Sequence, residues 1–259
     1  MDVATWNVNS LRPRLDHLLA WLDTAKPDVV CLQETKVVDE DFPGAPLREA
    51  GWSHQLIHGQ KTYNGVAILS RHPLEDPVVG FLDGEPDPQA RLVRATVRGV
   101  RIVNCYVPNG APLGSDKYAY KIAWYRRLRA ELDAHHDAGG DLLLCGDMNV
   151  APDDADVYDP FEAQGQVLTS APEREALQQL VGWGLTDAFR KKNPFKSDYS
   201  WWDYRGSAFR HNHGFRIDHI YLTRSLLRRC ASVRIDREPR TWERPSDHTP
   251  VVATLREPG

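Results

Sequence analysis

The chain has 259 residues, of which 41% are hydrophobic, so it is long enough to bury a substantial core. No stretch approaches the roughly 18 uninterrupted apolar residues of a membrane span, and the opening MDVATWNVNS lacks a signal peptide's basic head and apolar run, so we expect a cytoplasmic protein. The net charge of −4 argues against a simple basic nucleic-acid coat, although residues 185–259 carry 15 Lys and Arg against 9 Asp and Glu, an excess that suits a polyanion.

Hydrophobic patterning predicts strands and helices in alternation along the chain. The predicted strands are 2–7, 28–34, 65–70, 91–97, 101–107, 142–145, 199–204, 215–223, 231–236 and 249–255, and the predicted helices are 11–25, 118–135 and 172–184. Pro172 marks the start of the last helix, and Gly182 or Gly184 its end. No repeat and no Gly/Ser-rich linker divides the chain, so we expect one α/β domain over residues 1–259.

The cysteines are far apart and form no CxxC pair. Cys31, Cys105, Cys145 and Cys230 all lie in or beside apolar runs. Such cysteines act mostly as small hydrophobic residues, so we predict that they are reduced and structural.

The stretch DLLLCGDMNV, residues 141–150, places two polar residues directly after an apolar strand. Asp147 and Asn149 are two positions apart, so in an extended chain their side chains point the same way. Gly, Asp and Asn are also turn residues, which leaves a simple turn as one interpretation. The other is a site for a metal or a phosphate at the carboxyl end of a sheet.

Polar residues also lie at the ends of, within or directly before other predicted strands. They are Asn7 and Asn9, Glu34, Tyr106, Asp218, and the pair Asp247 and His248. Each alone could be a cap, a turn or a satisfied core group. If the strands share a sheet edge or two packed sheets, however, these groups converge in one pocket.

This set of residue types favours metal-assisted hydrolysis of a phosphate ester. Carboxylates such as Glu34 and Asp247 suit Mg²⁺, with Mn²⁺ as a substitute, because Mg²⁺ takes oxygen ligands and only one or two carboxylates. A histidine beside acids suits phosphate contact or proton transfer. The chain has neither the paired cysteines or histidine cluster of a zinc site nor a GxxxxGK[ST] motif for a nucleotide.

Seven motifs, in this order and spacing, resemble the exonuclease III family of abasic-site endonucleases, within the endonuclease/exonuclease/phosphatase superfamily. They are WNVNSLR, LQETK, YVPNG, GDMNVAP, SWWDYR, RIDHIYL and SDHTPV. The resemblance runs from Val3 to Val252. GDMN and SDH alone would indicate only the superfamily, whereas LQETK with SWWDYR and RIDH narrows it to this branch. The fold it implies is a four-layer αββα sandwich, two packed mixed β-sheets flanked by helices.

The resemblance also implies a magnesium site. Glu34 would be the main carboxylate ligand, and Asn7 and Asp247 would support the metal directly or through water. Whether one or two metal ions act stays open.

It implies catalytic roles for the other strand-end residues. Asp147 would orient and deprotonate the attacking water, and Asn149 would fix this water and bind the phosphate. Asp218 would hydrogen-bond His248, whose imidazolium form an adjacent acid stabilises. His248 would then contact a phosphate oxygen or act as the base, and both readings stay open. Tyr106 would donate to the phosphate or assist the leaving oxygen.

Three apolar residues would line a pocket for a flipped, base-less deoxyribose, namely Trp201, Phe215 and Ile217. Core packing is the other interpretation of these residues, and for Trp202 it is favoured. Phe215 and Ile217 face one way on a regular strand, and Asp218 would then face the other. A twisted or bulged strand would reconcile the two roles.

Arg91, Lys121, Asn109 and the basic segment 190–196 are candidates for contacts with the DNA backbone. For Lys121, a solvated charge on the polar flank of its helix is an equal alternative. His211 and His213 have HxH spacing without other metal ligands near them in the sequence. Many relatives have Arg in place of His213, which puts a phosphate contact there in doubt.

The resemblance implies a monomeric, Mg²⁺-dependent DNA repair nuclease. It would cut double-stranded DNA 5′ to an abasic site, leave a 3′-OH, trim 3′-blocked ends and have some 3′→5′ exonuclease activity. A non-catalytic nucleic-acid-binding relative is the first alternative, but it should have lost several of the acids that this chain keeps. A phosphatase or phosphodiesterase for lipid or inositol phosphates is the second, and the aromatic residues and the basic last third of the chain argue against it.

Overall fold

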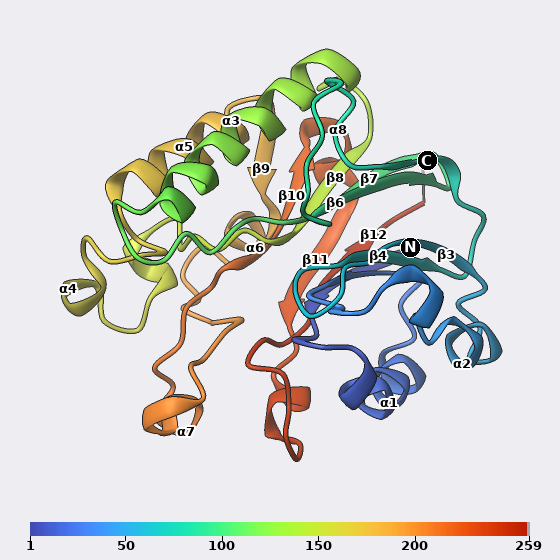
Figure 1. Ribbon diagram of the computed structural model, residues 1–259, viewed down its shortest axis with the longest axis horizontal. Helices are drawn as coiled ribbons and strands as arrows, with labels where there is room; N and C mark the ends of the chain where they lie inside the picture. Colours follow the sequence, from blue (N-terminus) through green and yellow to red (C-terminus); the bar gives the residue numbers. More distant parts are fainter. Residues whose placement is uncertain (258–259) are drawn as a thin grey trace.

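Two six-stranded mixed sheets form the centre of the protein in a computed structural model that describes residues 1–257 (Figure 1). The first sheet has the order β11 (Cys230–Ile235), β12 (Val251–Leu255), β1 (Asp2–Asn7), β2 (Val29–Gln33), β4 (Val66–Ser70) and β3 (His54–His58). The second has the order β5 (Glu75–Val79), β6 (Leu92–Val97), β7 (Val100–Tyr106), β8 (Leu142–Asp147), β10 (Asp218–Thr223) and β9 (Leu185–Asp187).

Each sheet contains one parallel pair, β1 with β2 and β7 with β8, among antiparallel neighbours. Strands buried on both faces need continuous apolar sequence. The runs VVCLQ of β2 and LLLC of β8 meet this need, and every residue of both strands is buried.

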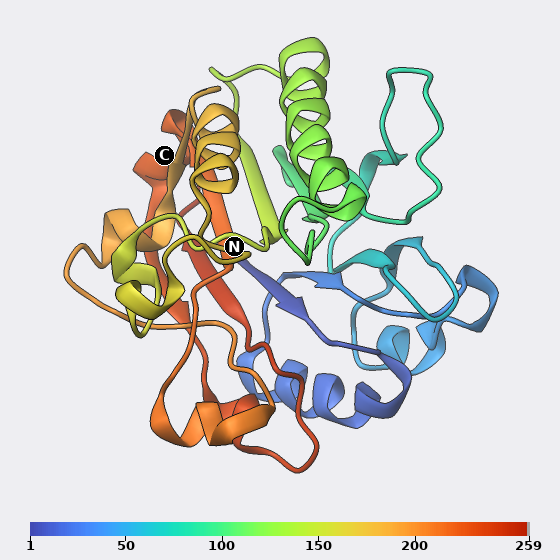
Figure 2. The same cartoon turned by 60° about the vertical axis from the view of Figure 1, so that its left-hand side comes forward.

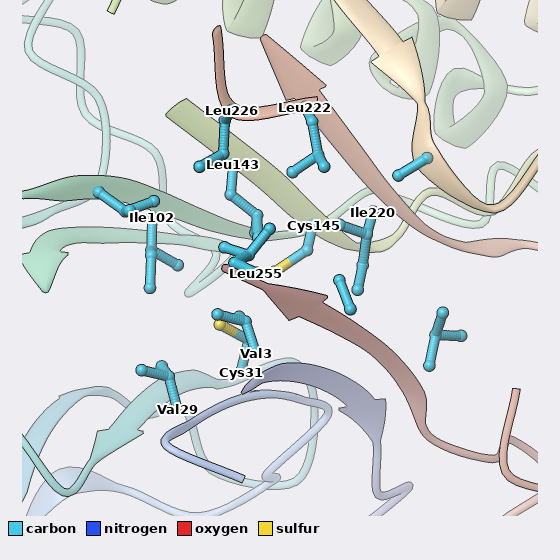
Figure 3. Close-up of a cluster of buried hydrophobic side chains, with 14 of the residues drawn as sticks. Val3, Val29, Cys31, Ile102, Leu143, Cys145, Ile220, Leu222, Leu226 and Leu255 are labelled. Carbon is cyan, nitrogen blue, oxygen red and sulfur yellow. The ribbon is translucent and has the colours of Figure 1, made fainter. Parts of the chain in front are cut away.

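The main core lies between the two sheets (Figure 3). Val3, Val29 and Cys31 from the first sheet face Ile102 and Leu143 from the second. The four cysteines are free and buried, as their apolar surroundings predict.

Helices cover the outer face of each sheet, so the four-layer αββα sandwich is confirmed (Figures 1 and 2). Helices α1 (Leu15–Ala25) and α2 (Gly44–Glu49) pack on the first sheet, and α3 (Asp116–His135) and α5 (Ala171–Val181) on the second. The shorter helices are α4 (Pro160–Ala163), α6 (Ala188–Lys192), α7 (Ala208–His211) and α8 (Arg224–Arg229). Within the described residues, no helix combines the length and apolarity that crossing a bilayer requires.

Local sequence accounts for where several helices begin. Helix α1 starts at Leu15 rather than at residue 11, because a 3₁₀ turn that contains Pro13 precedes it. Helix α5 starts as predicted, with Pro172 in its first turn and a capping box between Ser170 and Glu173.

Two strand predictions in the last third are wrong. Residues 199–204 form no strand, and only Trp201 pairs, through isolated bridges to Phe215 and His248. The strand predicted over 215–223 begins only at Asp218. The hydroxyl of Ser200 accepts hydrogen bonds from the N–H groups of both Ile217 and Asp218, at 3.1 and 3.0 Å, so the backbone departs from strand geometry just before β10. Strands β3, β5 and β9 have no counterpart among the predicted strands.

The register brings the polar ends of several strands to one edge of the sandwich. In the second sheet Asp147 pairs with Tyr106 on one side and with Asp218 on the other. In the first sheet Asn7 ends β1, and Glu34 follows β2, its parallel neighbour. The carboxyl ends of parallel strands lie at the same edge of a sheet. The polar residues of both sheets therefore lie at one edge of the sandwich.

Candidate active site

A hydrogen-bonded group of polar side chains joins the two sheets at this edge. The amide nitrogen Nδ2 of Asn7 donates to Glu34 Oε1 at 2.8 Å and to Asp147 Oδ2 at 2.9 Å. His248 Nδ1 lies 2.8 Å from Asp218 Oδ2, and its Nε2 lies 3.7 Å from Asp147 Oδ2. The predicted convergence of these strand ends is therefore present.

The charges in this group shift one another's protonation. Burial disfavours the cationic form of His248, but the carboxylates of Asp218 and Asp147 outweigh it and raise its pKa to about 10. Burial also raises the pKa of Asp147; the charges of Asp218 and Glu34 add to this rise, and His248 opposes it. For Glu34 burial is outweighed by Lys36, 2.8 Å away, and by the bond from Asn7, so its pKa is lowered.

Glu34, Asp147 and His248 offer ligand atoms that all lie within 4.8 Å of one another. The donor set fits a hard divalent cation, because two carboxylates meet here and a cation would relieve their mutual repulsion. His248, held cationic by Asp218, is better suited to donate a hydrogen bond than to ligate a metal. Asp247 lies apart from this group, with its oxygens bonded to Asn9 Nδ2 and Trp201 Nε1, each at 2.9 Å.

The GDMN stretch forms the turn that one interpretation predicts, and the turn places Asp147 and Asn149 at the polar edge that the other requires. The backbone N–H of Asn149 donates to Asp147 Oδ1 at 2.9 Å, and Asn149 has the positive φ of 49° that asparagine tolerates in turns. Its side chain donates to the carbonyl of Val107 at 2.9 Å and accepts from Asn109 Nδ2 at 3.0 Å. This turn thereby fixes both side chains beside the carboxylates.

The prediction that Lys121 is a solvated charge or a DNA contact is wrong. Its side chain is 0% exposed and forms an ion pair with the equally buried Glu173, so it is neither a solvated charge nor open to a direct DNA contact. Lys121 Nζ donates to the carbonyls of Asn109, at 3.0 Å, and Asn149, at 2.6 Å. It therefore supports, from beneath, two residues predicted to act on the substrate.

Tyr106 and Arg91 lie beside the carboxylates on the wall of a cavity of about 660 Å³. Arg91 donates to the Tyr106 carbonyl at 3.0 Å and places its guanidinium 4.5 Å from the Tyr106 ring centre. Burial, Glu34 and Asp147 together hold the pKa of Tyr106 well above its usual range, so the phenol keeps its proton. Asn109 lines the same cavity.

Trp201, Phe215 and Ile217 are brought together in an apolar cluster next to His248. The Trp201 and Phe215 rings pack edge to face at 5.8 Å, and Trp201 lies 6.5 Å from the His248 ring. The backbone of Ile217 and Asp218 departs from strand geometry where it bonds to the Ser200 hydroxyl. For this reason Ile217 lies in the apolar cluster while the Asp218 side chain contacts His248. Trp202 is core, as expected.

Three supporting residues, Lys36, Ser200 and Ser246, were not among the predicted site residues. Lys36 pairs with Glu34 and donates to Asn9 Oδ1 at 2.6 Å, and Ser246 donates to the Asn7 carbonyl at 2.7 Å. Ser200 positions Asp218. Lys36 belongs to the LQETK motif, so the sequence did contain a signal for it. The two serines depend on contacts across the fold.

Fold and site together define a phosphoesterase of the endonuclease/exonuclease/phosphatase class, and residues 4–248 match the model of the "Endonuclease/Exonuclease/phosphatase family". Exodeoxyribonuclease III of Haemophilus influenzae is 36% identical over 271 residues, with 99% of this chain and all of the relative covered. The chain belongs to the exonuclease III / AP endonuclease family of phosphodiester hydrolases within that superfamily.

Solved structures agree closely with this fold. The 3′ phosphatase NExo from Neisseria, bound to a product DNA hairpin, has a TM-score of 0.95 and 43% identity, covering 99% of this chain and 100% of its own. An AP endonuclease from Archaeoglobus fulgidus has a TM-score of 0.95 and 39% identity, covering 98% and 99%. These similar structures therefore represent two activities, 3′-phosphate removal and cleavage at abasic sites.

Proposed function

We propose that this protein is a Mg²⁺-dependent DNA repair nuclease that hydrolyses the phosphodiester 5′ to an abasic site and leaves a 3′-OH. The observation that carries this proposal is the apolar cluster of Trp201, Phe215 and Ile217 beside His248 and the carboxylates. A sugar that has lost its base is small, costs less to flip than a paired nucleotide, and suits such a cluster. Double-stranded DNA with abasic sites or 3′-blocked ends is thus the proposed partner of a protein that acts as a monomer.

Glu34 would be the main ligand of Mg²⁺, Asn7 would contact it directly or through water, and Asp247, which lies apart from this group, would act through water. Bound there, Mg²⁺ would neutralise charge on the phosphate and favour attack at phosphorus. Asp147, with its raised pKa, would accept the proton of the attacking water. Asn149 would hold that water and a phosphate oxygen in line.

His248 would act as a cationic donor to a phosphate oxygen rather than as the base. Asp218, 2.8 Å from Nδ1, holds the ring and leaves Nε2–H to face the substrate. Tyr106 would donate to the phosphate or to the leaving oxygen through its protonated phenol. Arg91 and Asn109, on the cavity wall, would contact the DNA backbone and position it without reading sequence.

Removal of phosphate and nucleotides from 3′ ends is a second activity that the same site supports. Neisseria NExo, at 43% identity, is described as a 3′ phosphatase. Trimming a 3′ end and nicking 5′ to a lesion both hydrolyse a phosphate ester and release a 3′-OH. A non-catalytic role is less well supported, because every predicted catalytic side chain is present and most are hydrogen-bonded at one edge.

The test uses labelled duplexes that carry an abasic-site analogue, a 3′-phosphate end or no damage, each with Mg²⁺, with EDTA and with Asp147→Asn. A single nick 5′ to the analogue that EDTA and the variant abolish would support the abasic-site endonuclease. Release of phosphate from the 3′ end without a nick would make 3′-end processing the main activity. Binding of all three duplexes without cleavage would overturn the enzymatic proposal.

A further inference from the structure

A continuous series of aromatic rings leads from the active site to the surface. From His248 it passes through Trp201 and Phe215, with ring-centre separations of 6.5 and 5.8 Å. It continues to Tyr158 at 6.0 Å and to His213 at 4.4 Å. The inner rings are accounted for by the proposed function, whereas Tyr158 and His213 have no role in it.

The outer pair is exposed, and its backbone is held in place. Tyr158 is 40% exposed and stacks on the exposed His213 with only 14° between the ring planes. The N–H of Tyr158 donates to the carbonyl of Gly214 at 3.1 Å, and that of His213 to the carbonyl of Ala208 at 2.8 Å. The two segments that carry these rings lie beside α4, at the left edge of the molecule in Figure 1, and beside α7, at its lower left.

The charge around Tyr158 identifies the part of a nucleic acid that would fit. Residues 150–173 contain no Lys or Arg, and although Asp154 pairs with Arg174 at 2.9 Å, Asp159 and Glu162 beside Tyr158 form no ion pair within the described residues. This loop therefore repels phosphates, whereas the flat face of a base is neutral and stacks on aromatic rings.

We propose that Tyr158 and His213 form a stacking surface for an unpaired base next to the sugar held at Trp201 and Phe215. The inference rests on the proposed function and extends it to substrate preference. A 3′ end or lesion whose flanking nucleotide is unpaired is processed faster than the fully paired equivalent, because its base reaches Tyr158 without the cost of opening a pair.

The test compares kcat/KM on two hairpins that differ only in whether the nucleotide flanking the cleaved bond is paired or mismatched. The ratio of the two values cancels losses of folded enzyme. Tyr158→Ala is expected to lower the mismatched-to-paired ratio about tenfold, the size of one lost stacking contact. Tyr158→Phe, which keeps the ring, retains the ratio. Phe161→Ala is the matched control, because Phe161 is 84% exposed in the same loop and belongs to no ring pair in the described residues.

A binding measurement separates this inference from the proposed function. 2-Aminopurine at the unpaired position is quenched when it stacks, and quenching is measured in the Asp147→Asn background with and without Tyr158→Ala. Quenching that disappears with Tyr158 supports the stacking surface even if neither hairpin is cut, a result that would count against the proposed function alone. Quenching and rate ratios that are the same in Tyr158→Ala and Phe161→Ala would overturn the inference.

Discussion

The residues around His248 determine its protonation state. It is buried, and Asp218 and Asp147 hold its pKa at about 10, so it stays cationic across the neutral range. A fixed imidazolium at this position suits electrostatic stabilisation of a phosphate oxygen.

Asp218→Asn is expected to test that role through the pH dependence. Loss of the carboxylate lowers the pKa of His248, so the alkaline fall in kcat/KM moves to lower pH. At pH 8 we expect a loss of about 10²-fold or more, and a smaller loss at pH 6. Rates measured from pH 6 to 10 check this, with the exposed Asp133→Asn as the control. An equal loss of kcat/KM at every pH, with the alkaline fall at its original pH, would show that Asp218 acts only on folding.

Lys121 and Lys117 lie four residues apart on α3 but in opposite environments. Lys121 is buried against Glu173, whereas Lys117 is exposed and lines the cavity beside the carboxylates. Lys121→Met would leave Glu173 as an unpaired buried charge and should destabilise the fold by about 3–5 kcal/mol. Lys117→Met should change stability by less than about 0.5 kcal/mol and weaken DNA binding. Urea unfolding measures the stability of both variants, and DNA titrations measure their affinity. A stable Lys121→Met protein together with a strongly destabilised Lys117→Met protein would contradict the buried position of Lys121.

At the scale of elements, β10 joins the site to the core through His219. The Nδ1 atom of His219 accepts a hydrogen bond from Arg216 Nη1 at 2.9 Å, and the Nε2–H of His219 donates to the Val150 carbonyl at 3.1 Å. The imidazole ring is therefore neutral, and both of its nitrogens are hydrogen-bonded. Burial and the neighbouring Arg216 lower its pKa to about 4. Val150 directly follows the Asp147 to Asn149 turn, so β10 supports the turn that carries two of the proposed catalytic residues.

This lowered pKa predicts acid sensitivity. In the unfolded chain His219 titrates near its ordinary pKa of 6.5, so its stabilising contribution is complete above that pH and falls as the pH drops from 6.5 to about 4. Urea midpoints at pH 7.5, 6.5, 5.5 and 4.5 should decline less steeply in His219→Gln than in the unaltered protein. Parallel declines in both proteins would exclude His219 as the source.

At the scale of the whole molecule, the site is a junction between the two sheets. Asn7 and Glu34 belong to the first sheet, and Asp147 to the second. A second polar junction lies deeper in the sandwich, where Gln33 donates to Asn104 Oδ1 at 2.7 Å across the sheets. These bonds fix the two sheets relative to each other and keep the proposed catalytic groups aligned.

Binding of Mg²⁺ across this junction should stabilise the entire fold. A ligand that binds only the folded state adds RT ln(1 + [L]/Kd), about 2.7 kcal/mol at a concentration 100 times Kd. We therefore expect Tm to rise with Mg²⁺ relative to EDTA, and this rise to vanish in Glu34→Gln. Glu49→Gln, an exposed substitution on α2, should keep it. An equal rise in both variants would show that Mg²⁺ binds elsewhere.

The sequence by itself determined the predicted strands that match β2 and β8 and the candidate residues at their ends, and its motifs identified the family, whose resemblance implied the four-layer sandwich. The strong apolar runs of β2 and β8 are local signals, and the motifs at their ends name side chains whose chemistry is specific. What lies within a few residues along the chain can be predicted in this way.

Only the tertiary structure decided what each charged side chain faces. Lys121 has the sequence surroundings of a surface lysine, but Glu173, 52 residues away, draws it into the interior. Ser200 bends the start of β10 and lets Ile217 and Asp218 serve different neighbours, which no strand pattern encodes. Burial and charge pairing depend on long-range contacts, and these exist only once the two sheets have packed.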